Sequence, residues 1–271
     1  MKAYSIDIEF MWGFQARVAG LGKSPPSFLF PPPTTLLGAL AASYGRRARR
    51  GESEGARLMQ ELSRYILVLS FRPINAIPLT FMDVGRVIAP GARGGVNYPT
   101  AKDVFVYKSF DAPARGSTIM GSIDEEPPRI RYVLVVEDDA PLAQEDLWSI
   151  RRLGSKESLV SVVRAEETPV SELGGSVHEG RLTLYATPEV EGLRVERHDP
   201  VARELYVSPY RLDGSPSAAY VQGAGILPYL VPMRLEHAEG CLEVSGTLSG
   251  YSFYEVEDPE RGRNVVVGVA R

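Results

Sequence analysis

The sequence has few cysteines, histidines and lysines, and it lacks any hydrophobic run long enough to cross a membrane. Its single cysteine, Cys241, excludes internal disulfides and a cysteine-based zinc cluster. It contains no His-x-x-x-His pair, Gly-x-x-x-x-Gly-Lys-Ser/Thr phosphate loop or Gly-x-Ser-x-Gly elbow. The first residues also lack the apolar core of a signal peptide. We therefore expect a cytoplasmic protein with no metal, no cofactor and no membrane partner.

A second absence is local, because residues 10–51 contain no aspartate or glutamate. Residues 84–110 and 147–165 each carry a net charge of +3, although the whole chain has a formal net charge of −4. Basic charge confined to certain segments is typical of a nucleic-acid binder, and the net charge hides it. The basic residues are mostly arginine, which suits phosphate recognition and equally fits an arginine-rich proteome. The window 10–51 holds Arg17, Lys23, Arg46, Arg47, Arg49 and Arg50.

The middle of the first window predicts a helix. The prolines at 31–33 cannot continue a helix but can open one. Thr34 and Thr35 are candidate N-caps, and Gly45 is a candidate C-cap. Because no acidic side chain lies in the first turn, the positive end of the helix is open to a phosphate. The alternative is a helix that only packs in the core and whose charges are solvated.

Strands and helices follow the order β-α-β-β-α-β through residue 165, the ferredoxin-like order that also serves RNA recognition modules (RRM). The same order occurs with many unrelated functions. We expect an α+β protein whose ferredoxin-like (RRM-like) N-terminal domain spans residues 1–168. The predicted segments besides the helix after residue 33 are a half-buried strand at 2–10, buried strands at 65–71 and 129–137, a helix at 139–153 capped by Gly154, and a strand at 158–164.

A long excursion interrupts this order. We expect a β-hairpin arm inserted at about 77–121, with strands at 79–88 and 103–110 and a glycine-rich basic tip around Arg93. Residues 169–271 predict a β-rich C-terminal lobe packed on the first domain. Its expected strands lie at 181–187, 192–198, 204–209, 241–247 and 265–270.

A short motif follows the second predicted helix. Residues 151–158 read Arg-Arg-Leu-Gly-Ser-Lys-Glu-Ser, and a glycine followed by a hydroxyl and a lysine can form a backbone concavity for anions. Acid–base catalysis could use His178, His198 or His237, and all three lie outside the basic windows. A Tyr107–Lys108 pair could substitute, but neighbours in a strand point to opposite faces. A lone histidine is more often structural or exposed than catalytic, so we expect no catalytic residue.

Together these features resemble the repeat-associated (RAMP) proteins of CRISPR systems, and most specifically the Cas-five subunit of archaeal subtype I-A Cascade. The resemblance is carried by Pro-Pro-Pro-Thr-Thr-Leu-Leu-Gly-Ala-Leu at 31–40, by Arg-Leu-Gly-Ser-Lys-Glu-Ser-Leu-Val-Ser-Val at 152–162, and by the inserted arm. It implies a non-catalytic RNA-binding subunit that holds the five-prime handle of the CRISPR RNA and caps the backbone filament in antiviral defence. The implied partners are CRISPR RNA, the Cas-seven backbone subunit and the large subunit, with target DNA reached indirectly.

The resemblance places the family's glycine-rich loop at 153–158 and its thumb at the arm. Trp12, Phe14, Tyr98 or Tyr107 would stack on bases, with core packing favoured for Phe14. Two other functions stay open: a metal-independent endoribonuclease that processes CRISPR repeat RNA, and a ferredoxin-like assembly module without an RNA role. The expected RNA-binding residues are Arg17, Lys23, Ser24, Thr34, Thr35, Arg46, Arg47, Arg93, Lys102, Lys108, Arg152, Gly154, Ser155 and Lys156.

Overall fold

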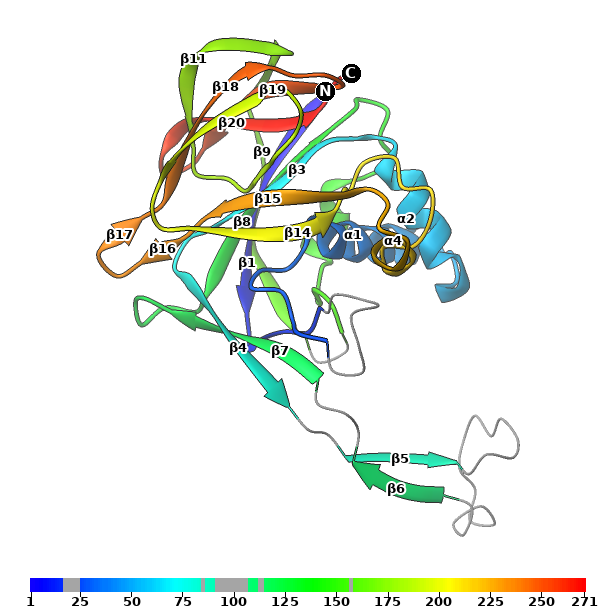
Figure 1. Cartoon of the computed structure of the whole chain (residues 1–271). Coiled ribbons are helices and arrows are strands. Elements are labelled where there is room, and N and C mark those ends of the chain that lie inside the picture. The colour runs from blue at the N-terminus through cyan, green and yellow to red at the C-terminus, as the bar shows by residue number, and fades with distance from the viewer. Residues whose placement is uncertain (17–24, 84–85, 91–106, 112–114, 156–157) are drawn as a thin grey trace.

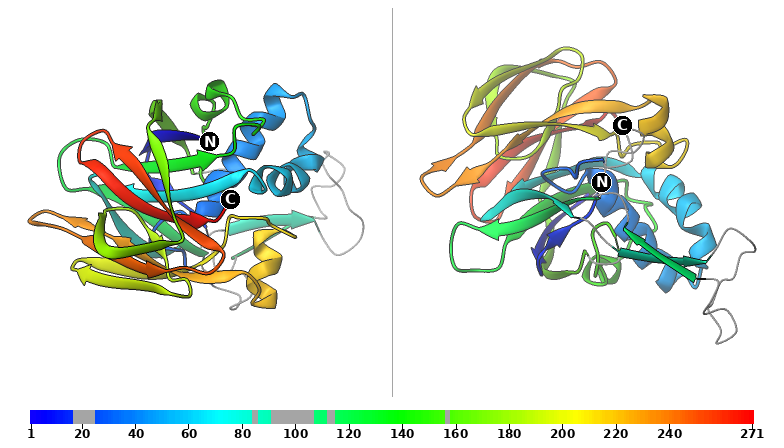
Figure 2. Two further views of the ribbon diagram at one scale, coloured as in Figure 1. Left: turned by 90° about the horizontal axis from the view of Figure 1, so that it is seen from above. Right: turned by 60° about the horizontal axis from the view of Figure 1, so that its bottom comes forward.

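The computed structural model describes residues 1–16, 25–83, 86–90, 107–111, 115–155 and 158–271. The protein is α+β, and every strand pairing within these residues is antiparallel. A central sheet carries short helices on one face and C-terminal strands on the other, while a β-hairpin arm projects from the body (Figures 1 and 2).

The central sheet has the strand order β3-β8-β1-β9. Its strands are β1 (Lys2–Phe10), β3 (Ile66–Pro73), β8 (Arg129–Val136) and β9 (Val160–Thr168). The prediction that β1 is half-buried was wrong, because Ser5 and Asp7 on its polar face are 2% exposed. The C-terminal strands cover that face, so both sides of the sheet are inside the protein.

Three helices cover the other face: α1 (Pro33–Arg47), α2 (Gly55–Ser63), which follows the 3₁₀ turn η1 (Glu52–Glu54), and the short α3 (Gln144–Trp148). Leu36, Leu37 and Leu40 of α1 pack in one core cluster with Ile6 and Ile8 of β1. The same cluster includes Tyr206 and Tyr229 from the C-terminal part of the chain. The helices are therefore joined to both parts of the protein through one core.

Both predicted caps of α1 were wrong. Pro32 is the N-cap residue, so Thr34 and Thr35 lie inside the first turn. The helix continues past Gly45 to Arg47. Gly45 instead allows α1 and α2 to approach closely, since a Cβ there would lie 3.0 Å from Leu58 Cδ1.

The predicted helix at 139–153 is present only as α3. Leu147, Ile150 and Leu153 are buried as the apolar spacing indicated. After α3, however, Arg152 forms a bridge with Leu159, so the chain turns back into β9 instead of continuing as a helix. The prediction that Gly154 caps this helix was therefore wrong.

The arm consists of two successive strand pairs. β4 (Ala76–Asp83) pairs with β7 (Arg115–Ser122), and further out β5 (Arg86–Pro90) pairs with β6 (Tyr107–Asp111). At the base of the arm, Ala76 pairs with Ser122 and Ile77 with Gly121. A short strand, β2 (Gly13–Phe14), adds to β7. The predicted tip around Arg93 lies outside the described residues.

The C-terminal part forms three small sheets, with orders β10-β19-β20, β11-β18-β13 and β12-β15-β14, and a two-stranded pair β16-β17. β15 and β19 were not predicted, in the case of β15 because Pro228 and Pro232 interrupt the apolar stretch. The predicted boundary at residue 168 stays a prediction. The elements are β10 (Val170–Gly174), β11 (Ser176–Thr183), β12 (Thr187–Pro188), β13 (Leu193–His198), β14 (Val201–Val207), α4 (Pro216–Gln222), β15 (Ile226–Pro232), β16 (Arg234–Leu235), β17 (Ala238–Glu239), β18 (Cys241–Thr247), β19 (Tyr251–Asp258) and β20 (Gly262–Val269).

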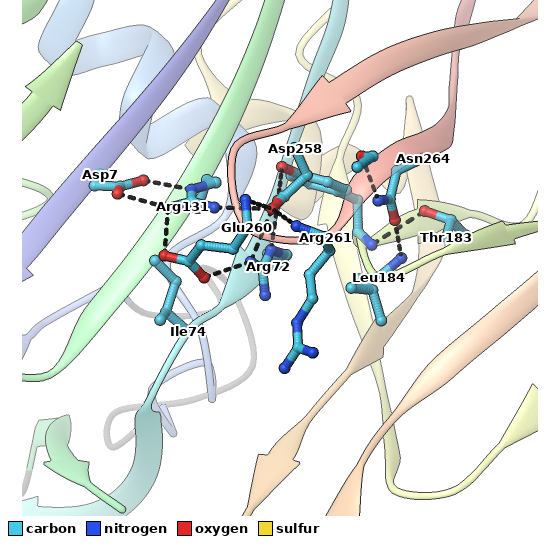
Figure 3. Close-up of polar contacts among 12 residues, drawn as sticks. Asp7, Arg72, Ile74, Arg131, Thr183, Leu184, Asp258, Glu260, Arg261 and Asn264 are labelled. Carbon is cyan, nitrogen blue, oxygen red and sulfur yellow. Dashed lines mark hydrogen bonds and ion pairs between the residues drawn. The ribbon is translucent and has the colours of Figure 1, made fainter. Parts of the chain in front are cut away.

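A buried ionic cluster joins the central sheet to the β19–β20 hairpin (Figure 3). Arg131 on β8 donates to both carboxylate oxygens of Asp7 on β1, at 2.6 and 2.8 Å, and to Asp258 at 2.9 Å. Arg72 on β3 donates to both oxygens of Asp258, at 2.7 and 3.1 Å. Glu260 accepts from both arginines. Buried charges of this kind are tolerated only when paired and hydrogen-bonded, so the cluster fixes the hairpin on the sheet.

Candidate nucleic-acid interface

A groove with a volume of about 730 Å³ lies between α1, the turn after α3 and the start of α4. Small residues of α1, namely Gly38, Ala39 and Ala42, belong to its lining. Because their side chains are short, a flat or extended ligand can approach the helix backbone closely. The remaining lining residues are Thr34, Thr35, Ser43, Arg46, Met59, Arg151, Arg152, Gly154, Pro216 and Ser217.

The first turn of α1 opens into this groove. It contains no acidic residue, and no side chain caps it. Pro33 has no backbone N–H, and the Thr35 N–H donates to the carbonyl oxygen of Pro32 at 2.8 Å, so Thr34 supplies the one N–H of this turn without a partner among the described residues, at the end that the helix dipole makes positive. Thr34 and Thr35 add hydroxyl groups at the same place. The start of α1 therefore favours an anionic ligand.

Arginines supply positive charge on both walls of the groove, Arg46 from the last turn of α1 and Arg151 and Arg152 from the segment after α3. Arg46 Nη2 donates to Ser43 Oγ at 3.0 Å and to the carbonyl oxygen of Ser149 at 2.8 Å, which fixes its guanidinium group beside the groove. Arg151 and Arg152 are exposed, and neither forms an ion pair within the described part of the chain. Their charges are thus available to a ligand, because no carboxylate competes for them there.

A tight turn places Arg152 at the groove. Leu153 N–H donates to the carbonyl oxygen of Ser158 at 3.0 Å, and Ser158 N–H donates to that of Ser155 at 3.2 Å. Gly154 has a φ of 116°, and a Cβ at this position would lie 2.9 Å from the carbonyl oxygen of Gln15. Only glycine fits both the conformation and the space, so Gly154 sets the shape of this wall.

No family model matches the chain. A curated relative, "CRISPR-associated protein Cas5 2" of Saccharolobus solfataricus, is 24% identical over 238 residues, which cover 86% of this chain and 83% of the relative. The "CRISPR system aCascade subunit Cas5 1" of the same organism is 27% identical over 63% of this chain and 67% of its own length. The crystal structure of a CRISPR protein from Archaeoglobus fulgidus superimposes with a TM-score of 0.70 and 29% identity, covering 100% of both chains.

These comparisons support a Cas5-type CRISPR-associated protein. The structure gathers five of the predicted site residues around one groove: Thr34, Thr35, Arg46, Arg152 and Gly154. Their contact with RNA stays a prediction. Ser155 lies in the same turn, with its Oγ 3.2 Å from Ser158 Oγ.

Arg47 differs from the other predicted residues. Its Nε and Nη2 donate to the two carboxylate oxygens of Asp146, at 2.8 and 2.7 Å, and Nη2 also donates to the carbonyl oxygen of Pro141. The Asp146 side chain is 1% exposed. The guanidinium group of Arg47 therefore holds α3 against α1, and the residue does not line the groove.

The remaining predicted positions are not placed at the groove. Lys108 lies in β6 on the arm. Phe14 is buried and packs against Phe10, with ring centroids 6.5 Å apart, so it does not present a free face for base stacking. Tyr107 begins β6, and Tyr98 lies outside the described residues. The other predicted residues outside the described part of the chain are Arg17, Lys23, Ser24, Arg93, Lys102 and Lys156.

Some groove residues were missed by sequence reasoning. Arg151 had a signal, because it stands beside Arg152 in the same basic window. Pro216 and Ser217 had none, since they lie far along the chain in an uncharged stretch. The three histidines do not line the groove, and His178 lies at a different depression, with a volume of about 410 Å³, beside Arg194. Within the described residues, no group of His, Cys, Asp or Glu could hold a metal ion, and no helix is long and apolar enough to span a bilayer.

Proposed function

We propose that this protein is a Cas5-type, non-catalytic RNA-binding subunit of a type I-A CRISPR surveillance complex (Cascade). Its groove holds the five-prime handle of the CRISPR RNA, and the protein caps the end of the backbone filament. In this proposal the central sheet and its helices form a ferredoxin-like module of the RAMP type. The partners are the CRISPR RNA, the Cas-seven backbone subunit and the large subunit, and target DNA is reached through the guide.

The observation that carries this proposal is the chemistry of the groove. An uncapped positive helix end faces arginine side chains that have no acidic partner within the described residues. A phosphate backbone satisfies both features at once, because it accepts from backbone N–H groups and from guanidinium groups. The relative named as an aCascade subunit supports the assembly into a larger complex.

The alternative of an acidic protein partner makes a different prediction. Phosphate contacts release condensed counterions, so affinity for a single strand falls with salt at a slope of about −0.7 per neutralised phosphate. If the groove recognises RNA specifically, its affinity for RNA also stays higher than its affinity for an unrelated polyanion when the salt concentration is raised. Equal affinity for RNA and for an unrelated polyanion would favour the alternative, an assembly module without an RNA role.

The test uses the purified protein and end-labelled CRISPR repeat RNA in EDTA, run on a native gel and on a denaturing gel. We expect a shifted band and intact RNA. The double variant Arg151→Ala with Arg152→Ala is expected to weaken binding at least tenfold, because hydrogen bonds to charged groups contribute about 1.5–3 kcal/mol each. Its salt slope is expected to fall by about 1.4, which corresponds to two lost phosphate contacts.

The control is Arg263→Ala, which removes one positive charge on β20, away from the groove, and is compared with the single variant Arg152→Ala as well as with the double variant. Arg263 is 77% exposed and faces Glu255 at 3.5 Å, so its loss costs little stability. Equal weakening by Arg263→Ala and by the groove variant would contradict a local site. A discrete cleavage product in EDTA would instead identify the metal-independent endoribonuclease.

A further inference from the structure

A partly buried carboxylate in β14 reaches the segment that leads into α1. Glu204 accepts hydrogen bonds from the backbone N–H groups of Leu29 and Phe30, with N···O distances of 2.7 and 3.0 Å. It also accepts a hydrogen bond from the hydroxyl of Tyr206. Within the described residues no lysine or arginine pairs with it. Desolvation raises the pKa of Glu204, so this carboxylate is retained at an energetic cost.

The segment after Phe30 packs in the core but has no backbone N–H donors of its own. Residues 31–33 are prolines, which have no backbone N–H and a fixed φ. Leu29 and Phe30 therefore provide the last backbone donors before Thr34. Because the proline run is stiff, fixing these two donors also fixes the direction in which α1 begins.

The same strand also holds the second wall of the groove. Phe28 lies between Tyr206 of β14 and Tyr220 of α4, with ring centroids 5.4 and 5.7 Å away. The Tyr220 hydroxyl donates to the carbonyl oxygen of Leu205 and accepts from Val207 N–H, both at 3.2 Å. Since Pro216 and Ser217 of α4 line the groove, β14 connects both of its walls.

We propose that Glu204 is a positioning residue that holds the start of α1 in the arrangement in which the groove binds RNA. The inference rests on the proposed function of the groove. A carboxylate suits this role because its two oxygens accept from two N–H groups and a hydroxyl together. A glutamine has one acceptor oxygen, and its NH₂ group would face another donor.

The test compares Glu204→Gln with a destabilising control, Val244→Ala, which shortens a fully buried side chain of β18 in a separate core cluster. Hydrogen–deuterium exchange is followed in peptides that cover residues 27–37, and RNA binding is measured at a temperature where both variants are folded. Glu204→Gln is expected to speed exchange in these peptides and to weaken RNA binding about tenfold, as for one lost hydrogen bond to a charged group. Val244→Ala is expected to lower the melting temperature without either change.

Tyr206→Phe provides a second variant if Glu204→Gln does not fold, because it removes only the hydroxyl donor and is expected to give a smaller change in the same two readouts. Unchanged exchange at 27–37, or unchanged RNA affinity in a variant whose exchange is faster, would overturn the inference. If the wild-type protein binds no RNA, or the arginine double variant binds as well as the wild type, the proposed function fails instead. In that case the exchange data alone decide whether Glu204 holds the segment.

Discussion

Arg131 and Asp258 lie 127 residues apart in the sequence, and a hydrogen bond of 2.9 Å between them joins the central sheet to the β19–β20 hairpin. Both side chains are fully buried. Arg72 and the hydroxyl of Tyr185 also donate to Asp258. The carboxylate is therefore the centre on which two cations from the central sheet converge (Figure 3).

Replacing Asp258 by asparagine is expected to destabilise the protein by about 3–5 kcal/mol, because two buried arginines lose their shared counter-charge. Urea denaturation followed by circular dichroism measures the free energy of unfolding. The control is Glu255→Gln, which breaks an exposed pair with Arg263 and should change this energy by less than about 1 kcal/mol. A similar small loss in both variants would show that the cluster contributes no more than surface pairs.

The same carboxylate predicts a pH dependence. Hydrogen bonds and charge from Arg72 and Arg131 outweigh the desolvation and lower the pKa of Asp258 to about 2, from an ordinary value of 3.8. Because the folded-state pKa is the lower one, the stabilisation is present above about pH 4 and is lost as the pH falls toward 2; a shift of this size corresponds to about 2 kcal/mol. A carbon-detected NMR titration of the Asp258 carboxyl group checks it, and a midpoint near 4 would contradict it.

Arg47 and Arg152 are expected to behave in opposite ways. Arg47→Ala leaves the buried carboxylate of Asp146 without its cation and should cost about 1–3 kcal/mol of stability. Arg152→Ala removes an exposed side chain and should change stability by less than about 0.5 kcal/mol. RNA affinity is expected to fall in Arg152→Ala and to hold in Arg47→Ala at temperatures where the variant is folded. Chemical denaturation and native gels, run on both variants, test this crossed pattern.

Gly154→Ala is expected to weaken both the fold and RNA binding. Its new Cβ would lie 2.9 Å from a backbone oxygen, and the residue would keep a positive φ, so we expect a loss above about 1 kcal/mol. Gly250→Ala separates the two causes, since Gly250 also has a positive φ, of 71°, but has open space around it. If both variants lose the same stability and RNA affinity is unchanged, the close packing at Gly154 does not shape the groove.

Local sequence patterns predicted the elements that have a periodic apolar pattern or whose contacts lie near in the sequence. The alternation in residues 2–10 predicted β1, and the proline run predicted where α1 begins, although Thr34 and Thr35 are not its N-caps. The same patterns could not show that β1 is buried on both faces, since this depends on strands more than 200 residues later. The apolar spacing of residues 142–153 fits either a helix or a turn followed by a strand, and the bridge between Arg152 and Leu159 decided the outcome.

The sequence predicted those residues of the candidate site that carry a positive charge. Arg46 and Arg152 lie in basic windows, and the structure brings them to one groove. Glu204 gave no signal, because its partners are backbone N–H groups of Leu29 and Phe30, 175 and 174 residues away. A lone glutamate in a predicted strand looks the same whether it caps a distant segment or faces solvent.

The ionic cluster also affects when its side chains can become buried during synthesis of the chain. Arg72 and Arg131 leave the ribosome long before Asp258, so two side chains destined for the core stay hydrated until the β19–β20 hairpin is made. Burying them earlier would leave Arg72 without a carboxylate partner and Arg131 with Asp7 alone. The groove, whose α4 wall is also made late, is therefore completed only once the second part of the chain has docked. A half-made chain would offer RNA its arginines but no finished binding surface.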